Sequence, residues 1–326
     1  MANEMSEIIQ LNVPEEFENE RLDIFITRMF DLIPSRSFAS KLIENNKVKV
    51  DQKFQKSSFR LKKNQIIELN TSFLTEINPN PIGENIPLNI LYEDAHLIVI
   101  HKPAGMVVHP GAGVHSGTLV NAILGYCGAT LPSLGAPSRA GIVHRLDRDT
   151  SGVMVVAKSQ LALTQLSKQF ADHSQIRIYH AIVYGELNPK EGKIETWHGR
   201  DPKNRLKYSV QEMGVGKKAI LNYATIKNIC QNLISLVSCQ LYTGRTHQIR
   251  VQMSSINHGI IGDALYAKTP QTIKANKELL ALISKNAIRQ MLHAVHLGFK
   301  HPLTGEHMGF DAPYPDDFQN ILNLLQ

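Results

Sequence analysis

The spacing of apolar residues predicts a small unit of two helices and a short sheet near the N-terminus. Apolar residues recur every three or four positions over residues 22–29, as in an amphipathic helix. A second helical pattern follows, in which Phe38, Leu42 and Ile43 share the inner face. Two strands are then predicted, at residues 47–50 and 65–69.

The remainder of the chain is rich in strand patterns. Buried strands are expected at residues 97–100 and 153–157, and a helix at residues 159–173. Further strand patterns then follow at residues 176–187, 205–211, 218–228 and 233–241. Because successive strands without an intervening helix usually pair antiparallel, we expect an α+β fold with a mixed, largely antiparallel sheet and not a doubly wound parallel one.

Shifts in composition divide the 326 residues into four parts. These are an acidic segment (1–20), a small α/β domain (21–75), a linker containing Asn-Pro-Asn-Pro (76–87) and a large domain (88–326). A chain of this length suits about two domains.

Composition excludes several classes of protein. Hydrophobic residues make up 43% and charged residues 20%, which is globular, and no apolar run approaches the ~20 residues that a membrane helix needs. Residues 1–20 hold six Glu and no Lys or Arg, unlike a signal peptide. The three cysteines are widely spaced, which argues against a disulfide framework. We therefore expect a cytoplasmic protein with no membrane partner.

The distribution of charge is more informative than its total of +6. Residues 1–20 carry −6, residues 36–63 carry +7 and residues 200–218 carry +4. The positive segments favour a polyanionic partner, although a solvated basic surface is the alternative. The candidate RNA-binding residues in the small domain are Arg36, Lys41, Lys47 and Lys49.

Asp147 is the first candidate catalytic residue. It lies between Arg145 and Arg148 in a charged loop, residues 141–152, that connects apolar segments. Neighbouring guanidinium groups keep a carboxylate ionised, as a nucleophile requires. The alternative is a purely structural ion pair.

Two further candidates are Tyr179 and Arg245. Alternation over residues 176–181 places Tyr179 on one face of a strand, where it could serve as an acid, a base or a stacking ring, or simply pack in the core. Gly244 permits a sharp turn before a helix that Thr246 would cap, and Arg245 at this junction could bind a carboxylate or phosphate or lie on the surface.

Cofactor and metal motifs are missing from the sequence. No GxGxxG follows a strand, and neither a phosphate-binding GxxxxGK[ST] loop, an HExxH nor a CxxC pair occurs. We therefore expect neither a cofactor nor a metal site.

Part of the chain resembles the S4 RNA-binding domain. The matching segments are Arg21-Leu22-Asp23, Pro34-Ser35-Arg36-Ser37 and Lys47-Val48-Lys49-Val50. Asn45-Asn46 stands where that pattern usually has glycine, and Asn also tolerates a left-handed backbone.

Nearly the whole chain, residues 21–69 and about 88 to 326, resembles the RluA-type family of RNA pseudouridine synthases, and within it the enzymes that modify large-subunit ribosomal RNA. The most specific match is His144-Arg145-Leu146-Asp147 followed by Thr150-Ser151-Gly152. The resemblance implies that Asp147 is the nucleophile, paired with Arg245. It also implies that Tyr179 stacks on the target uracil and can accept a proton, and that Arg145 fills the gap left by the flipped-out uridine.

The resulting hypothesis is a cofactor-independent, monomeric RNA pseudouridine synthase. Its partner would be large-subunit rRNA or a precursor ribosomal particle. The reaction breaks the glycosidic C–N bond and forms a C–C bond to the same ribose, through attack at C1′, attack at C6 or a glycal. The alternatives are a non-catalytic RNA-binding or assembly factor on the same fold and a glycosylase that would release free uracil. The joint presence of Asp147, Tyr179 and Arg245 favours the synthase.

Overall fold

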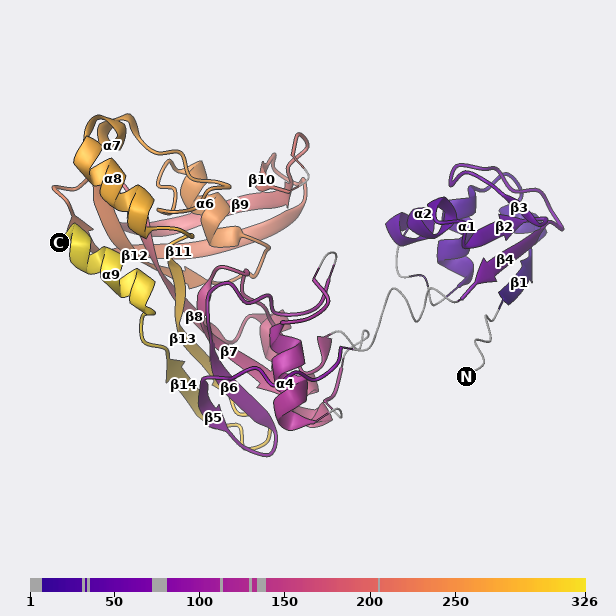
Figure 1. Cartoon of the computed structure of the whole chain (residues 1–326), viewed down its shortest axis with the longest axis horizontal. Helices are drawn as coiled ribbons and strands as arrows, with labels where there is room; N and C mark the ends of the chain where they lie inside the picture. The colour runs from indigo at the N-terminus through magenta and orange to yellow at the C-terminus, as the bar shows by residue number, and fades with distance from the viewer. Residues whose placement is uncertain are drawn as a thin grey trace. The chain divides into compact units, whose positions relative to one another are not determined.

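The computed structural model describes residues 8–30, 33, 36–71, 81–111, 114–128, 131–133, 139–204 and 206–326. The chain divides into two compact units, residues 1–80 and 81–326 (Figure 1). We describe each unit by itself.

The small unit is a four-stranded antiparallel sheet with two helices. Its elements are β1 (Ile8–Asn12), a 3-10 helix (Glu15–Phe17), α1 (Leu22–Met29), α2 (Arg36–Glu44), β2 (Val48–Val50), β3 (Lys53–Phe54) and β4 (Ile66–Asn70). The sheet order is β1-β4-β2-β3. The predicted helices and strands are confirmed, and Asn46 has a left-handed φ of 57° as expected for its turn. The predicted break at Pro34-Ser35 lies outside the described residues.

The acidic segment is not separate from this unit, contrary to the predicted boundary at residue 21. β1 pairs with β4 from Ile8↔Asn70 to Asn12↔Ile66, and Ile9 and Leu11 pack against the core. The carboxylate of Glu15 lies 2.6 Å from the ammonium of Lys63. The acidic composition hid an alternating apolar pattern, because only two residues of β1 face the core.

The large unit contains one long sheet. Its strands are β5 (Ile90–Glu93), β6 (Leu97–Lys102), β7 (Ser151–Ala157), β8 (Ile176–Tyr184), β9 (Glu191–Arg200), β10 (Tyr208–Gln211), β11 (Lys217–Ile229), β12 (Ile234–Leu241), β13 (Leu292–Lys300) and β14 (His307–Asp311). The order is β10-β9-β11-β12-β8-β13-β7-β6-β5, with β14 beside β13. Among the described strands, only β13 and β7 pair in parallel, which confirms the mixed, largely antiparallel α+β fold.

Helices cover the sheet of the large unit. They are α4 (Leu119–Cys127), α5 (Gln160–Asp172), α6 (Gln248–Ser255), α7 (Gln271–Ala275), α8 (Lys277–Asn286) and α9 (Asp316–Leu325), and α8 packs against α9 (Figure 1). β7 is buried along its full length because its alternate residues enter two cores. Met154 packs in the larger core, whereas Val153 and Val155 pack with Leu163 of α5 in another. None of the described helices is long and apolar enough to cross a membrane.

The predicted linker is partly integrated into the large unit. Residues 76–80 lie outside the described residues, and residues 81–87 have no regular structure. Asn121 of α4 donates a side-chain hydrogen bond to the carbonyl oxygen of Ile82 at 2.8 Å. A Cβ on Gly83 would lie 2.8 Å from the backbone nitrogen of Gly125, so glycine allows this close contact.

Candidate active site

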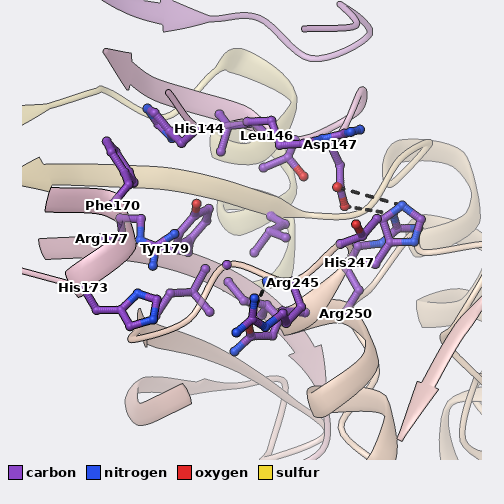
Figure 2. Close-up of a pocket in the computed structure, with 18 of the residues that line it drawn as sticks. His144, Leu146, Asp147, Phe170, His173, Arg177, Tyr179, Arg245, His247 and Arg250 are labelled. Atoms are coloured by element: carbon purple, nitrogen blue, oxygen red, sulfur yellow. Dashed lines mark hydrogen bonds and ion pairs between the residues drawn. The ribbon is translucent and has the colours of Figure 1, made fainter. Parts of the chain in front are cut away.

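A pocket of about 400 Å³ opens on the large unit where the loop before β7, strand β8 and the turn between β12 and α6 meet (Figure 2). Arg145, Asp147, Tyr179 and Arg245 all line it. The four residues are up to 100 positions apart in sequence, and the fold brings them to one cavity.

Packing of His144 fixes the loop that carries Asp147. The Nε2 atom of His144 accepts a hydrogen bond from the backbone N–H of Val155 at 3.1 Å, and its ring stacks on Phe170 of α5 with centroids 4.4 Å apart. Burial, with a smaller contribution from Arg177, lowers the pKa of His144 to about 3, so the ring stays neutral and can accept this bond. The next apolar residue, Leu146, is buried.

The carboxylate of Asp147 pairs with Arg250. Its Oδ2 lies 3.0 Å from Nη1 of Arg250, and its Oδ1 lies 3.9 Å from Nε2 of His247 (Figure 2). The side chain of Asp147 is 16% exposed, so one side of the carboxylate remains open to the pocket. A guanidinium at this distance forms a charge-assisted hydrogen bond that holds the carboxylate in place.

Arg250 is itself held by a second carboxylate. Its Nε and Nη2 donate to Asp263 at 2.7 and 2.9 Å, and its guanidinium lies 5.0 Å from the centre of the Tyr266 ring. Burial opposes the charged form of Arg250, but the hydrogen bonds and charges of Asp263 and Asp147 outweigh it and raise its pKa. Arg250 is therefore a fixed, permanent cation beside Asp147.

This geometry corrects the predicted partner of Asp147. The Nε atom of Arg245 donates to the backbone carbonyl of Lys218 at 3.0 Å, and the ion pair with Asp147 is made by Arg250 instead. His247 has a left-handed φ of 59° and precedes α6, so the helix places Arg250 in its first turn beside the loop of Asp147. The signal in the sequence was a second arginine in the same motif, five residues after Arg245.

The expected helix cap at Thr246 is also wrong. α6 begins at Gln248, and its N-cap is His247, which makes no side-chain capping bond. The Oε1 atom of Gln248 instead accepts hydrogen bonds from the Thr243 hydroxyl at 2.8 Å and the Arg245 N–H at 3.0 Å. This glutamine bridges the turn and closes it on the end of β12.

Tyr179 lies on the pocket face of β8, as the alternation predicts. It is 7% exposed, and neighbouring positions on the same face, Arg177 and Ala181, are also buried. Its hydroxyl has no hydrogen-bond partner among the described residues, unlike a core tyrosine whose hydroxyl is satisfied. Burial raises the pKa of Tyr179; Asp147 adds to this effect and Arg177 opposes it.

His247 and Tyr266 form a supporting network that the sequence did not single out as functional. The Nδ1 atom of His247 lies 2.7 Å from the hydroxyl of Tyr266, which also accepts the backbone N–H of Tyr208 at 2.9 Å. Burial lowers the pKa of His247, which favours its neutral form beside Asp147. This network orients both residues that approach the Asp147 carboxylate.

The candidate RNA-binding residues of the small unit differ in their contacts. Arg36 and Lys41 are exposed on α2, and Arg36 also pairs with the buried Asp23 at 2.8 Å. Lys47 is half-buried, and the ammonium of Lys49 lies 5.3 Å from the Phe54 ring.

The basic stretch at 200–218 lies on β9, β10 and the start of β11. Its lysines at 203, 217 and 218 are exposed, and Arg205 lies outside the described residues. Within the described ranges, no group of three or more His, Cys, Asp or Glu side chains is arranged so that it could hold a metal ion.

Comparisons with known proteins match both units. The model of the RNA pseudouridylate synthase family matches residues 96–255, and that of the S4 domain matches residues 20–67. The chain is 46% identical over 242 residues to a protein of Zymomonas mobilis named ribosomal large subunit pseudouridine synthase D, covering 74% of each chain. It is 41% identical to a protein of the same name from Neisseria meningitidis, covering all of this chain and 84% of that one.

Further matches agree with these. An uncharacterized RNA pseudouridine synthase of Aquifex aeolicus is 39% identical, covering 99% of this chain and 98% of the relative. The solved structure of human RNA pseudouridylate synthase domain containing 4 aligns with a TM-score of 0.55 and 26% identity, covering 73% of this chain and 92% of the human one. With the pocket geometry and these identities over most of its length, the chain belongs to the RNA pseudouridine synthase family and is an isomerase of that class.

Proposed function

We propose that this chain converts uridine to pseudouridine in large-subunit ribosomal RNA, with Asp147 as the nucleophile. Two of the relatives, at 46% and 41% identity, are named ribosomal large subunit pseudouridine synthase D, which suggests RNA of the large ribosomal subunit as the substrate. The observation that carries the proposal is the Asp147 carboxylate, which is paired by Arg250 on one side and open to the pocket on the other.

The chemistry needs such a carboxylate. The C1′–N1 bond breaks with its electron pair going to the uracil, the ring turns, and C5 forms a bond to C1′. The proton on C5 is lost and N1 gains one, so the reaction is an isomerisation with no net redox change. A carboxylate that is already ionised can attack the substrate without first losing a proton.

The remaining pocket residues have separate roles in this proposal. Tyr179 stacks on the flipped-out uracil, and its hydroxyl passes its own proton to N1 as it accepts the proton from C5. Arg145 fills the space that the uridine leaves in the RNA, which offsets part of the cost of unstacking. Arg245, which does not pair with Asp147, contacts the RNA from the turn after β12.

The small unit adds RNA affinity. Its S4 domain and its basic α2 and β2 suit phosphate contacts, with Arg36, Lys41, Lys47 and Lys49 as the residues involved. We propose that the chain acts as a cytoplasmic monomer on the rRNA or a precursor ribosomal particle.

The test uses the full chain and large-subunit rRNA transcribed in vitro, which carries no modification. Asp147→Asn should abolish pseudouridine formation, measured by mass spectrometry of nuclease digests. Asp149→Asn is the matched control, because Asp149 lies in the same loop with its side chain 45% exposed and should retain activity. Full activity of the Asp147 variant would disprove the nucleophile assignment, and release of free uracil by the wild type would indicate a glycosylase.

A further inference from the structure

Arg177 is a buried cation to which the proposed function assigns no role. It lies on β8 two residues before Tyr179, lines the same pocket and is only 7% exposed. Its Nε and Nη2 atoms are buried and have no hydrogen-bond partner among the described residues. This contrasts with Arg250 in the same pocket, which makes three hydrogen bonds to carboxylates.

The surroundings of Arg177 do not compensate its charge. Its guanidinium lies 5.8 Å from the centre of the Phe170 ring, and a Cβ on Gly244 would lie 2.7 Å from its Nη1. The ionisable groups that interact with it are Tyr179, Arg245, His144 and His173, of which Arg245 is also a cation. Burial lowers the pKa of Arg177, and the proximity of Arg245 adds to this.

An unpaired guanidinium is costly to bury, so the free protein bears a penalty that a ligand with an acceptor oxygen would relieve. The position of Arg177 indicates which acceptor this is. Asp147 lies at one end of the pocket, Arg177 lies at the other, and Tyr179 lies between them (Figure 2). A uracil stacked on Tyr179 with its ribose toward Asp147 therefore points its far edge, which carries O4, toward Arg177.

We propose that Arg177 donates to O4 of the target uracil and stabilises the negative charge that this oxygen gains during the reaction. The inference rests on the proposed function. Attack of Asp147 at C6 pushes an electron pair toward O4, and cleavage of C1′–N1 leaves an anionic uracil that shares its charge between O2 and O4. Charge therefore develops at O4 by either route, and also in the glycal route, where the same anion leaves. A fixed donor in a dry site is most effective at such an atom.

The same contact selects the base. Uracil presents an acceptor at position 4, whereas cytosine presents an amino group there. The guanidinium of Arg177 has only hydrogen-bond donors. If it faced the amino group of cytosine, neither group would find an acceptor, and both would stay unsatisfied. Arg177 thus acts as a catalytic and specificity-determining residue.

The experiment measures single-turnover pseudouridine formation on a large-subunit rRNA fragment that the wild-type chain modifies. Arg177→Gln should lower the rate at saturating RNA about 100-fold, the range found for loss of one charge-stabilising donor. Arg177→Lys should restore part of the rate. The salt dependence of the affinity for the RNA should be unchanged, because no phosphate contact is lost.

A second arm replaces the target uridine by 4-thiouridine. Sulfur is a weak hydrogen-bond acceptor, so 4-thiouridine should slow the wild type more than it slows the Arg177→Gln variant. Any effect of sulfur on the leaving group is the same in both proteins and cancels in this comparison. Arg245→Gln is the matched control, since it removes another pocket arginine and should keep the wild-type thio effect. Gly244→Ala, whose new Cβ would displace the guanidinium, should lower the rate about tenfold and tests the same contact if Arg177→Gln folds poorly.

Two results would overturn the inference. One is an equal thio effect in the wild type and Arg177→Gln. The other is a fall in RNA affinity with a smaller salt slope in Arg177→Gln, which would identify a phosphate contact. The proposed function fails separately, if the wild type forms no pseudouridine in any rRNA fragment.

Discussion

The two ends of the pocket treat buried charge in opposite ways. At one end Asp147, Arg250 and Asp263 form a chain of ion pairs with distances of 2.7–3.0 Å. At the other end Arg177 is equally buried, yet two of its nitrogen atoms have no partner in the described structure. The first arrangement is complete before the substrate binds, whereas the second is completed by it.

This difference follows from what each charge has to do. A nucleophile must be ionised and aimed at the start of the reaction, so its counter-charge belongs to the protein. A group that stabilises charge developing on the substrate must not be neutralised beforehand, because a protein carboxylate would compete with the transition state. The two ends should therefore respond differently when one charge is removed.

The largest effect is expected at the paired end. Asp263→Asn removes the bidentate partner of Arg250 and leaves a buried guanidinium held only by Asp147. We expect a loss of about 3 kcal/mol in the free energy of unfolding and a rate about 100-fold lower. Unfolding of the large unit can be followed by the fluorescence of Trp197, the single tryptophan, on β9.

Asp23→Asn provides the matched control for this variant. Asp23 in the small unit is also buried and also pairs with two arginines, Arg21 and Arg36. Its loss should destabilise the small unit and leave the rate at saturating RNA unchanged. A normal rate in Asp263→Asn would show that the fixed position of Arg250 is not needed for catalysis.

The unpaired end should show the opposite sign in stability. Arg177→Met removes a buried, uncompensated charge and fills a similar volume, so the free energy of unfolding should rise by about 1 kcal/mol. The rate should nevertheless fall about 100-fold. A destabilisation comparable to that of Asp263→Asn would contradict the contrast between the two ends, because it would mean that Arg177 holds the fold together.

The sequence predicted which residues line the pocket better than it predicted which of their side chains form ion pairs. Asp147, Tyr179, Arg145 and Arg245 all line one cavity, since motif and strand periodicity both constrain them. Which arginine pairs with Asp147 depended on the left-handed backbone at His247, a conformation that histidine adopts more often than most residues but that remains uncommon for it. Tertiary contacts decided that point.

Two other features were hidden for different reasons. β1 was missed because its charged surroundings outweighed two inward apolar residues, Ile9 and Leu11. Arg177 is unpaired because no acceptor among the described residues reaches its Nε and Nη2 atoms. The spacing of residues in a sequence does not predict the absence of such a contact. The fold class and most of the predicted strands, in contrast, follow from hydrophobic periodicity and were confirmed, although the strand predicted at 205–211 begins only at Tyr208. Four strands of the large unit, β5, β9, β13 and β14, were not predicted.

The carboxylate of Asp94 lies outside the pocket and is also fully hydrogen-bonded, so it tests whether such pairing occurs without a role in catalysis. Burial alone would raise the pKa of Asp94, but hydrogen bonds from the backbone of His96 and Leu97 and from His301 and Tyr92 outweigh it and lower the pKa to about 2. A depressed carboxyl pKa stabilises the folded state above the unfolded value near 4, and this stability is lost as the pH falls through 2.

Asp94→Asn should therefore cost about 2 kcal/mol at pH 7 and flatten the loss of stability between pH 4 and pH 2. The measurement is thermal unfolding across that range. The rate of pseudouridine formation should be unchanged, since Asp94 does not line the pocket. A lower rate would mean that this turn influences the site.

The smallest effects are expected in the small unit, where the same contrast recurs on the surface. Arg36 is paired with Asp23, whereas the side chain of Lys41, five residues later on α2, has no ion-pair partner among the described residues. A free cation is available for a phosphate, and a paired one is already partly neutralised. Lys41→Gln should therefore reduce the slope of RNA affinity against salt by about one, with no change in stability.

Arg36→Gln should show the reverse pattern. Asp23 is buried and keeps Arg21 as its second partner, so the loss of Arg36 should lower stability by about 1 kcal/mol at most and change the salt slope less than Lys41→Gln does. Filter binding at a series of salt concentrations, with thermal unfolding of each variant, separates the two effects. Equal salt slopes for both variants would show that pairing in the free protein does not determine which cations reach the RNA, and the rule drawn from the pocket would then hold only where burial excludes water.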